Sequence, residues 1–211
     1  MKTLAIIGSG DLGQQIAHYA LSDNHYSTVV FFDDFSNENQ VNGMEILGTT
    51  ESIEKSFSED LFHEIIIGLG YKHLAVKKEM YDNLMRNEIP FGRIIHSSCW
   101  VDESAIVEHG CIIYPGCLID ANAIIKANTV LNIGCTISHD STIESHCFLA
   151  PRVAVAGFVN VSEQCFLGIN STVIDSISIV EKTRIGGATV VVKSIEKSGL
   201  YVGNPAKFLK L

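Results

Sequence analysis

The sequence predicts an α/β domain followed by an all-β solenoid, because the pattern of the 211-residue chain changes near residue 95. The first part carries strand and helix patterns around a glycine-rich turn. From Ile95 onward, an aliphatic residue recurs at every sixth position without a gap, with a small or β-branched residue four places after it. A period of six fits neither an α-helix nor an isolated strand, whereas a fixed repeat is typical of a solenoid.

The repeat predicts a triangular coil in which three hexads make one turn of eighteen residues. Coils hydrogen-bonded at a strand spacing of roughly 4.8 Å are stable only as a stack. The aliphatic positions, expected in the interior, are Ile95, Val101, Val107, Ile113, Ile119, Ile125, Leu131, Ile137, Ile143, Leu149, Val155, Val161, Leu167, Val173, Ile179, Ile185 and Val191.

All six cysteines stand at the small-residue position of a hexad: Cys99, Cys111, Cys117, Cys135, Cys147 and Cys165. This placement predicts free thiols that act as small hydrophobic side chains. The sequence has no CxxC pair, so neither a disulfide nor a metal site is predicted.

Charge and hydropathy narrow the class of protein. A formal net charge of −9 argues against broad nucleic-acid binding, which needs a basic surplus to neutralise phosphates. The chain opens directly on an apolar strand pattern with no signal-peptide pattern, and no apolar run approaches the roughly 18 residues that span a bilayer. A cytoplasmic protein without a membrane partner is therefore expected.

The first domain, predicted over residues 1–92, opens with a strand at 2–7, the turn Gly8-Ser9-Gly10-Asp11-Leu12-Gly13, a helix at 14–21 and a strand at 28–32. Glycines in such a turn let backbone N–H groups approach a phosphate at the helix N-terminus. Asp33 and Asp34 follow the second strand, where an acidic side chain suits a ribose hydroxyl. A tight turn without a ligand is the alternative interpretation.

The turn alone would suggest NAD, but only about 60 residues separate Asp33 from the solenoid. They hold a strand at 64–68, a helix at about 73–86, a polar loop at 37–43 and a turn before a last strand at 93–95. A second mononucleotide half is missing, so a half-Rossmann βαβ unit that binds a nucleoside diphosphate is predicted. Gly70 and Lys72 follow the third strand at the same edge, and Lys72 either contacts phosphate or is a solvated helix-start lysine.

Within the second domain, predicted over 93–211, His139 stands two places after the buried Ile137 and so outside the core. Imidazole is the usual general base near neutral pH, and the neighbouring Asp140 could fix its tautomer. Gly157 lies eighteen residues on, one coil above, where its backbone N–H could bind an oxyanion. A solvated corner histidine is the alternative.

Several motifs occur together in this chain: the glycine turn, residues 31–35, the Asn132 to His139-Asp140 spacing, Ala156-Gly157, and residues 165–170, 185–188 and 202–207. With these motifs the chain resembles the hexapeptide-repeat sugar acyltransferases. This family includes the sialic acid O-acetyltransferases and the N-acetyltransferases of nucleotide-linked 4-amino-4,6-dideoxy sugars. The match covers nearly the whole chain.

The resemblance implies a left-handed parallel β-helix and a homotrimer with active sites between subunits. It implies that His139 takes a proton from the sugar amine as the amine attacks acetyl-CoA, that Asp140 supports His139, and that Asn132 lines the substrate side. Acetyl-CoA is the expected co-substrate, with no metal. The residues expected to bind it are His146, Gly157, Gly187, Ala188, Pro205 and Lys207.

The activity implied is N-acetylation of a nucleotide-linked 4-amino-4,6-dideoxy sugar in surface-glycan biosynthesis, with UDP favoured as the carrier. O-acetylation of a sugar such as sialic acid and a non-catalytic nucleotide-sensing scaffold are the alternatives.

Two positions depart from the family pattern. Asp11 stands where family members carry a histidine, and Phe148 stands where a second histidine is often found. His146 either replaces that histidine or is an exposed corner residue.

Overall fold

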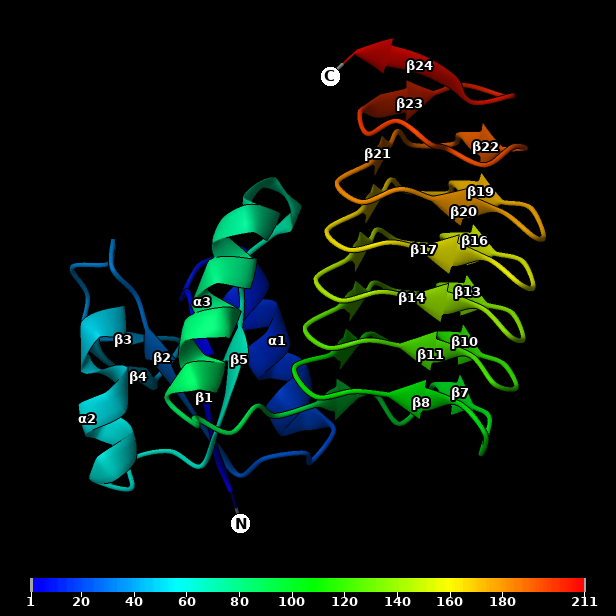
Figure 1. Ribbon diagram of the computed structural model, residues 1–211. Coiled ribbons are helices and arrows are strands. Elements are labelled where there is room, and N and C mark those ends of the chain that lie inside the picture. The colour runs from blue at the N-terminus through cyan, green and yellow to red at the C-terminus, as the bar shows by residue number, and fades with distance from the viewer. Residues whose placement is uncertain (1, 211) are drawn as a thin grey trace. The chain divides into compact units, whose positions relative to one another are not determined.

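The computed structural model describes residues 2–210, which divide after Ile94 into two compact units (Figure 1). Within this described range, no helix is both long enough and apolar enough to cross a membrane. Each unit is built on a different plan, so each is taken separately.

The first unit is a five-stranded sheet with strand order β3-β4-β2-β1-β5. Strands β4, β2, β1 and β5 are parallel, and β3 joins β4 as an antiparallel edge. The chain moves from β1 to β2 on one side and later to β5 on the other, so the loops after β1 and β5 flank a crevice at the carboxyl edge. The elements are β1 (Thr3–Ile7), α1 (Asp11–Ser22), β2 (Thr28–Phe32), β3 (Gln40–Val41), β4 (Met44–Gly48), the 3₁₀ turn η1 (Thr50–Ser52), α2 (Ile53–Ser58), β5 (Glu64–Ile67), the 3₁₀ turn η2 (Tyr71–His73) and α3 (Leu74–Arg86).

The polar segment at 37–43 is not simply a loop, and in this respect the sequence prediction is wrong. Its second half forms a hairpin with β4, turning at Asn42 and Gly43, whose φ values are 50° and 77°. Two successive left-handed residues are typical of the tight hairpin turn that Asn-Gly favours. β4 and α2 were not predicted, because both are short and only weakly periodic.

The structure also differs from the prediction of a last strand at 93–95 before the solenoid. Phe91 forms a single parallel bridge with Ile65 beside β5. Strand β6 (Ile94–Ile95) instead pairs within the sheets of the solenoid.

The glycine turn of the first unit is held by close backbone contacts. A Cβ atom on Gly13 would lie 1.9 Å from the carbonyl oxygen of Gly8, and one on Gly68 would lie 3.0 Å from the carbonyl oxygen of Ile7. The start of α1 therefore packs directly on the ends of β1 and β5. A Cβ on Gly10, by contrast, would meet nothing within 4 Å.

These contacts predict that Gly13→Ala destabilises the protein by on the order of 3 kcal/mol, since the added methyl group overpacks a backbone contact that cannot yield. Gly10→Ala is the matched control, because the same methyl group has open space around it. Thermal unfolding of the two variants beside the wild-type protein measures the difference. Equal melting temperatures for the two variants would contradict the packing account.

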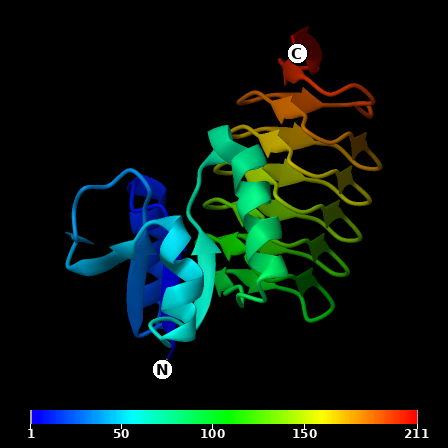
Figure 2. The same ribbon diagram turned by 60° about the vertical axis from the view of Figure 1, so that its left-hand side comes forward.

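The second unit is a stack of coils whose strands form three sheets (Figures 1 and 2). The strands are two residues long and parallel, except in the C-terminal hairpin of β23 and β24. The first sheet contains β7 (Trp100–Val101), β10 (Leu118–Ile119), β13 (Thr136–Ile137), β16 (Ala154–Val155), β19 (Thr172–Val173) and β22 (Val190–Val191). The second contains β8 (Ile106–Val107), β11 (Ile124–Ile125), β14 (Thr142–Ile143), β17 (Asn160–Val161) and β20 (Ser178–Ile179). The third contains β6, β9 (Ile112–Ile113), β12 (Val130–Leu131), β15 (Phe148–Leu149), β18 (Phe166–Leu167), β21 (Arg184–Ile185), β23 (Leu200–Val202) and β24 (Lys207–Lys210).

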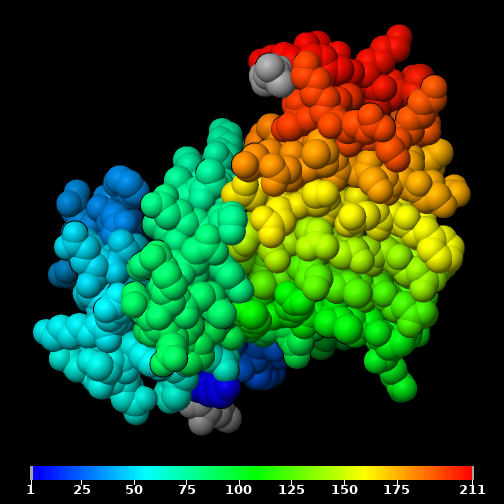
Figure 3. Space-filling view, viewed as in Figure 1, coloured from blue at the N-terminus to red at the C-terminus, as the bar shows by residue number. Residues whose placement is uncertain are grey.

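Paired residues in neighbouring coils are eighteen positions apart, as in Leu118 with Thr136 and Ile119 with Ile137. The predicted parallel β-helix with eighteen-residue coils is therefore confirmed. In the space-filling view of Figure 3 the coils form successive bands that end, in red, at the antiparallel hairpin of β23 and β24.

The interior of the coils follows the six-residue pattern. The aliphatic positions from Val107 to Val191 are buried in one continuous core, and Ile95 and Val101 are partly buried against it. At most of the small positions that carry a thiol or hydroxyl, this group donates to the carbonyl oxygen fifteen residues on, as in Cys135 to Ala150 at 3.2 Å and Ser141 to Ala156 at 2.7 Å. The hydroxyls of Ser171 and Thr183 are exceptions, since neither makes a hydrogen bond. This shared hydrogen bond explains why a thiol and a hydroxyl can occupy equivalent positions in different coils.

The cysteines are free, and all except the half-buried Cys99 are buried, as predicted. The neighbouring thiol of Cys135, together with burial, raises the pKa of Cys117 to about 12. A thiol with so high a pKa stays protonated near neutral pH and is a poor nucleophile. The cysteines of the core therefore serve packing.

Candidate active site

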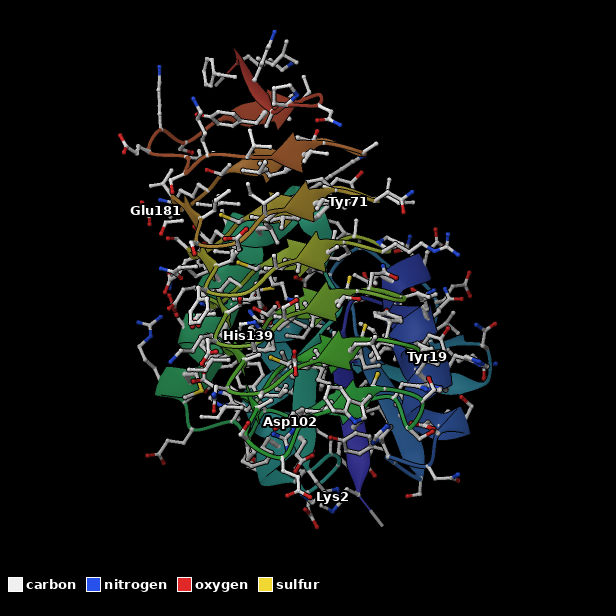
Figure 4. The ribbon with its side chains drawn as sticks, turned by 90° about the vertical axis from the view of Figure 1, so that its right-hand side faces the viewer. Lys2, Tyr19, Tyr71, Asp102, His139 and Glu181 are labelled. Carbon is white, nitrogen blue, oxygen red and sulfur yellow. The ribbon has the colours of Figure 1, made fainter. Side chains whose placement is uncertain are left out.

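His139 lies at a corner of the β-helix, immediately after β13 and midway along the stack (Figure 4). Its side chain is 48% exposed, and its Nδ1 lies 2.9 Å from Oδ2 of Asp140. When Nδ1 carries the proton of this hydrogen bond, the Nε2 lone pair is left available to accept another proton. The pair has the geometry of a general base with an orienting carboxylate.

Asp140 is well suited to remain ionised. Hydrogen bonds from His139 and from Asn122 hold the pKa of its carboxyl below the ordinary value. Its backbone adopts a left-handed conformation with φ of 57°, which aspartate tolerates better than most residues. The turn thus brings the carboxylate back beside the ring of the preceding residue.

Gly157 lies directly against His139, as the eighteen-residue spacing predicted. A Cβ atom on Gly157 would lie 2.7 Å from Cε1 and 2.9 Å from Nε2 of the imidazole. Only glycine leaves room for the ring at this place. The next residue, Phe158, is 60% exposed and stands edge to face with His139, with ring centroids 5.1 Å apart.

Phe158 was not singled out from the sequence. Its φ of 57° is a left-handed conformation that is uncommon for a bulky residue. At the same corner in other coils the equivalent residues are Asn122, Asp140 and Ser176, all small and polar. The stacking arithmetic that located Gly157 could have identified Phe158 as the exception.

Asn132, expected on the substrate side, and His146, expected to bind acetyl-CoA, stand at other corners of the β-helix than His139. Asn132 stands at the preceding corner, before β13, and its side-chain oxygen accepts the N–H of Ile133 at 2.7 Å. His146 stands at the following corner, after β14, and is only 2% exposed. Its Nδ1 lies 2.9 Å from Nδ2 of Asn128, eighteen residues earlier. The interpretation of His146 as an exposed corner residue is therefore wrong, because it is stacked on the coil below.

The remaining residues proposed for acetyl-CoA are also spread around the β-helix. Gly187 and Ala188 follow β21, at a corner different from that of His139. Pro205 and Lys207 line a cavity of about 260 Å³ beside the C-terminal hairpin, together with Lys193 and Tyr201. A separate groove of about 330 Å³ runs over β13, β16 and β19 and includes Ser138 and Ala156, the residues before His139 and Gly157.

The first unit has a cavity of about 570 Å³ at the predicted crevice. Its walls come from the ends of β1, β2 and β5 and from the first turns of α1 and α3. The lining residues are Ile7, Gly8, Gly10, Asp11, Leu12, Phe32, Asp33, Asp34, Phe35, Gly68, Leu69, Gly70, His73, Val76 and Met80. Most of the positions predicted for substrate binding in this unit are therefore brought together.

The two carboxylates after β2 are held in internal hydrogen bonds. Asp33 accepts the backbone N–H and hydroxyl of Ser9, both at 2.7 Å, and the N–H groups of Phe35 and Ser36. Partial burial would raise the pKa of Asp33, but these hydrogen bonds outweigh it and lower the pKa. Asp34 accepts the N–H and hydroxyl of Thr50. Both carboxylates thus brace the loops that shape the cavity.

Lys72 does not line this cavity, whereas the next residue, His73, does. The two residues lie in the same 3₁₀ turn, η2, so the exact course of that turn decides which side chain faces inward. His73 is the single basic side chain among the lining residues. The sequence carried no signal that could have separated the two.

Over residues 2–210, no group of three or more His, Cys, Asp or Glu side chains is placed to hold a metal ion.

The chain is similar to a known family model and to several solved structures. Residues 3–84 match the family model described as the PglD N-terminal domain. Among curated proteins, none matches. The acetyltransferase domain of PglB from Neisseria gonorrhoeae has a TM-score of 0.91 and 25% identity, with 99% of this chain and 100% of that chain covered. PerB from Caulobacter crescentus, solved in complex with CoA and GDP-perosamine, has a TM-score of 0.90 and 25% identity, with 99% and 98% covered.

WeeI from Acinetobacter baumannii, at 17% identity and a TM-score of 0.86, shares the fold over 99% of this chain and 100% of that one. Fold and site together define an acetyltransferase built on a left-handed β-helix. The resemblance to the hexapeptide-repeat acetyltransferases of sugars, including those of nucleotide-linked amino sugars, is confirmed.

Proposed function

We propose that the protein is an acetyl-CoA-dependent N-acetyltransferase that acts on the 4-amino group of a nucleotide-linked 4-amino-4,6-dideoxy sugar in surface-glycan biosynthesis. The observation that carries this proposal is the corner where His139, paired with Asp140, lies against Gly157. The solved relatives support it, since one is described as a complex with CoA and GDP-perosamine and another as an acetyltransferase domain.

In the proposed reaction the sugar amine attacks the thioester carbonyl of acetyl-CoA. Nε2 of His139 accepts the proton that the amine loses, and the Asp140 carboxylate stabilises the imidazolium that forms. The backbone N–H of Gly157 would stabilise the oxyanion of the tetrahedral intermediate. The intermediate then expels the CoA thiolate, which leaves an amide on the sugar. Holding both substrates beside His139 supplies a large part of the acceleration.

We also propose that the protein works as a homotrimer with the active site between subunits. The residues expected to bind acetyl-CoA stand at different corners of one β-helix, so a single groove can gather them only where two chains pack side by side. The buried His146 would serve there by shaping the wall through Asn128.

The test is the release of thiol from acetyl-CoA in the presence of UDP-, dTDP- and GDP-linked 4-amino-4,6-dideoxy sugars and of free sialic acid. UDP is the carrier favoured from the sequence, and the GDP-sugar complex of PerB makes GDP the main competitor. Release with one amino-sugar nucleotide would support N-acetylation and identify the carrier. Release only with sialic acid would support O-acetylation instead.

Nucleotide binding by the first unit is expected to depend on His73. Replacing His73 with Gln should weaken the binding of free UDP or GDP by about 10-fold, the usual effect of losing a hydrogen bond to a charged group.

Isothermal titration calorimetry with UDP and with GDP measures the effect of His73→Gln. Lys72→Gln distinguishes the two neighbours, since Lys72 lies outside the cavity lining and its loss should leave affinity within about twofold. Unchanged affinity in His73→Gln together with a tenfold loss in Lys72→Gln would reverse the assignment.

A further inference from the structure

Asp140 is held from two sides. Its Oδ2 lies 2.9 Å from Nδ1 of His139, and its Oδ1 accepts a hydrogen bond of 3.1 Å from Nδ2 of Asn122. Asn122 is eighteen residues earlier, one coil below, and occupies the same left-handed turn position with the same φ of 57°. The two side chains are therefore stacked along one corner of the β-helix.

Asn122 is itself fixed by the coils around it. Its backbone N–H donates to Oγ of Ser104 at 2.9 Å, and that hydroxyl donates to Oδ1 of Asp102 at 2.6 Å. The backbone N–H of Asp140 donates to the carbonyl oxygen of Ala121, next to Asn122, at 2.9 Å. Figure 4 labels the two ends of this series, His139 and Asp102. The amide of Asn122 thus meets the carboxylate from a rigid position.

We propose that Asn122 is a positioning residue for the reaction, acting through Asp140 to fix the tautomer and the orientation of the His139 imidazole. A carboxylate with one partner can rotate about its terminal torsion, which has a broad energy profile. A second donor on the other oxygen removes this freedom. The proposal rests on the proposed function, in which Nε2 of His139 is the base.

The uncharged amide is important for this role. The imidazolium formed during the reaction meets one carboxylate, that of Asp140. In the coil above, the neighbours of the His139 ring are Gly157 and Phe158, which carry no titratable group. In the coil below, Asn122 donates a hydrogen bond to the Asp140 carboxylate without adding charge. A second carboxylate at position 122 would stabilise the imidazolium further and hold the base in its protonated form.

A purely structural role is the competing explanation, because asparagine is favoured in left-handed turns. Two substitutions separate the explanations. Asn122→Gly keeps the backbone conformation at no steric cost but removes the amide. Asn122→Asp keeps the shape but replaces the donor by a negative charge.

Both variants should lower kcat by roughly 10-fold, with the KM for acetyl-CoA unchanged, as expected for losing one hydrogen bond to a charged group. Asn122→Asp should also move the acidic limb of the kcat/KM profile to higher pH, since the added charge favours the imidazolium. The matched control is Asn24→Asp, the same change at an exposed left-handed residue after α1. Its profile should match that of the wild-type protein.

Nitrogen-15 NMR of the histidine rings gives a readout that does not need turnover. In the wild-type protein His139 should show the tautomer protonated at Nδ1, and in Asn122→Gly a mixture of both tautomers. Changed tautomers in a protein that acetylates none of the acceptors would support the positioning role while refuting the proposed function. The positioning role would be overturned if the wild-type protein is active and both Asn122 variants keep its histidine tautomers, its kcat and the acidic limb of its kcat/KM profile.

Discussion

Replacing His139 with alanine is expected to lower turnover by roughly 10²- to 10⁴-fold, the usual contribution of a general base. The imidazole is paired with Asp140 at 2.9 Å, and no other histidine lies at this corner in the described chain. Melting temperature should change little, because the side chain is 48% exposed and contributes little to the core. Steady-state kinetics with acetyl-CoA and the preferred acceptor measure the loss.

The control for this prediction is His18→Ala, which removes an exposed histidine from α1. It should keep wild-type turnover. If His139→Ala turned over within about threefold of the wild-type rate, His139 could not be the base, and the alternative interpretation as a solvated corner residue would hold.

Gly157→Ala is expected to lower turnover by about 10²- to 10³-fold, comparable with the loss of one oxyanion-hole donor. The added methyl group would lie 2.7 Å from Cε1 of His139, and the ring cannot stay in place at that distance. The substitution therefore disturbs both the base and the site where the oxyanion forms. A turnover close to the wild-type rate would contradict this geometry.

The double variant Gly157→Ala with His139→Ala separates these two effects. If Gly157→Ala acts only by displacing the imidazole, the double variant should be no slower than His139→Ala alone. A further loss in the double variant would reveal the contribution of the oxyanion site, since no ring remains to be displaced.

The β-helix could be predicted closely because its information is local. Each hexad specifies its own interior residue, and every coil repeats after eighteen residues, so Ile119 and Ile137 stack without reference to the rest of the fold. The same eighteen-residue spacing predicted that Gly157 lies beside His139. Applied to every corner residue, it would also have paired Asn128 with His146 and Asn122 with Asp140.

The first unit was harder to predict because its short elements depend on tertiary pairing. Strand β4 acquires its role only by pairing with β2, and the inward position of His73 depends on the course of a single 3₁₀ turn. The use of Asp33 as a brace for Ser9 follows from distances that no spacing rule contains. The glycine turn and the residues after the strands indicated a binding crevice here, but only the structure shows which side chains line it.

The central claim is that one acetyl group passes from acetyl-CoA to the sugar amine with His139 as the base. The most direct measurement is carbon-13 NMR of the product formed from acetyl-CoA labelled at the carbonyl carbon and the amino-sugar nucleotide that supports thiol release. The account predicts an amide carbonyl on the 4-amino nitrogen, formed by the wild-type enzyme and almost absent with His139→Ala. An ester carbonyl, or an amide formed equally fast by both proteins, would contradict it.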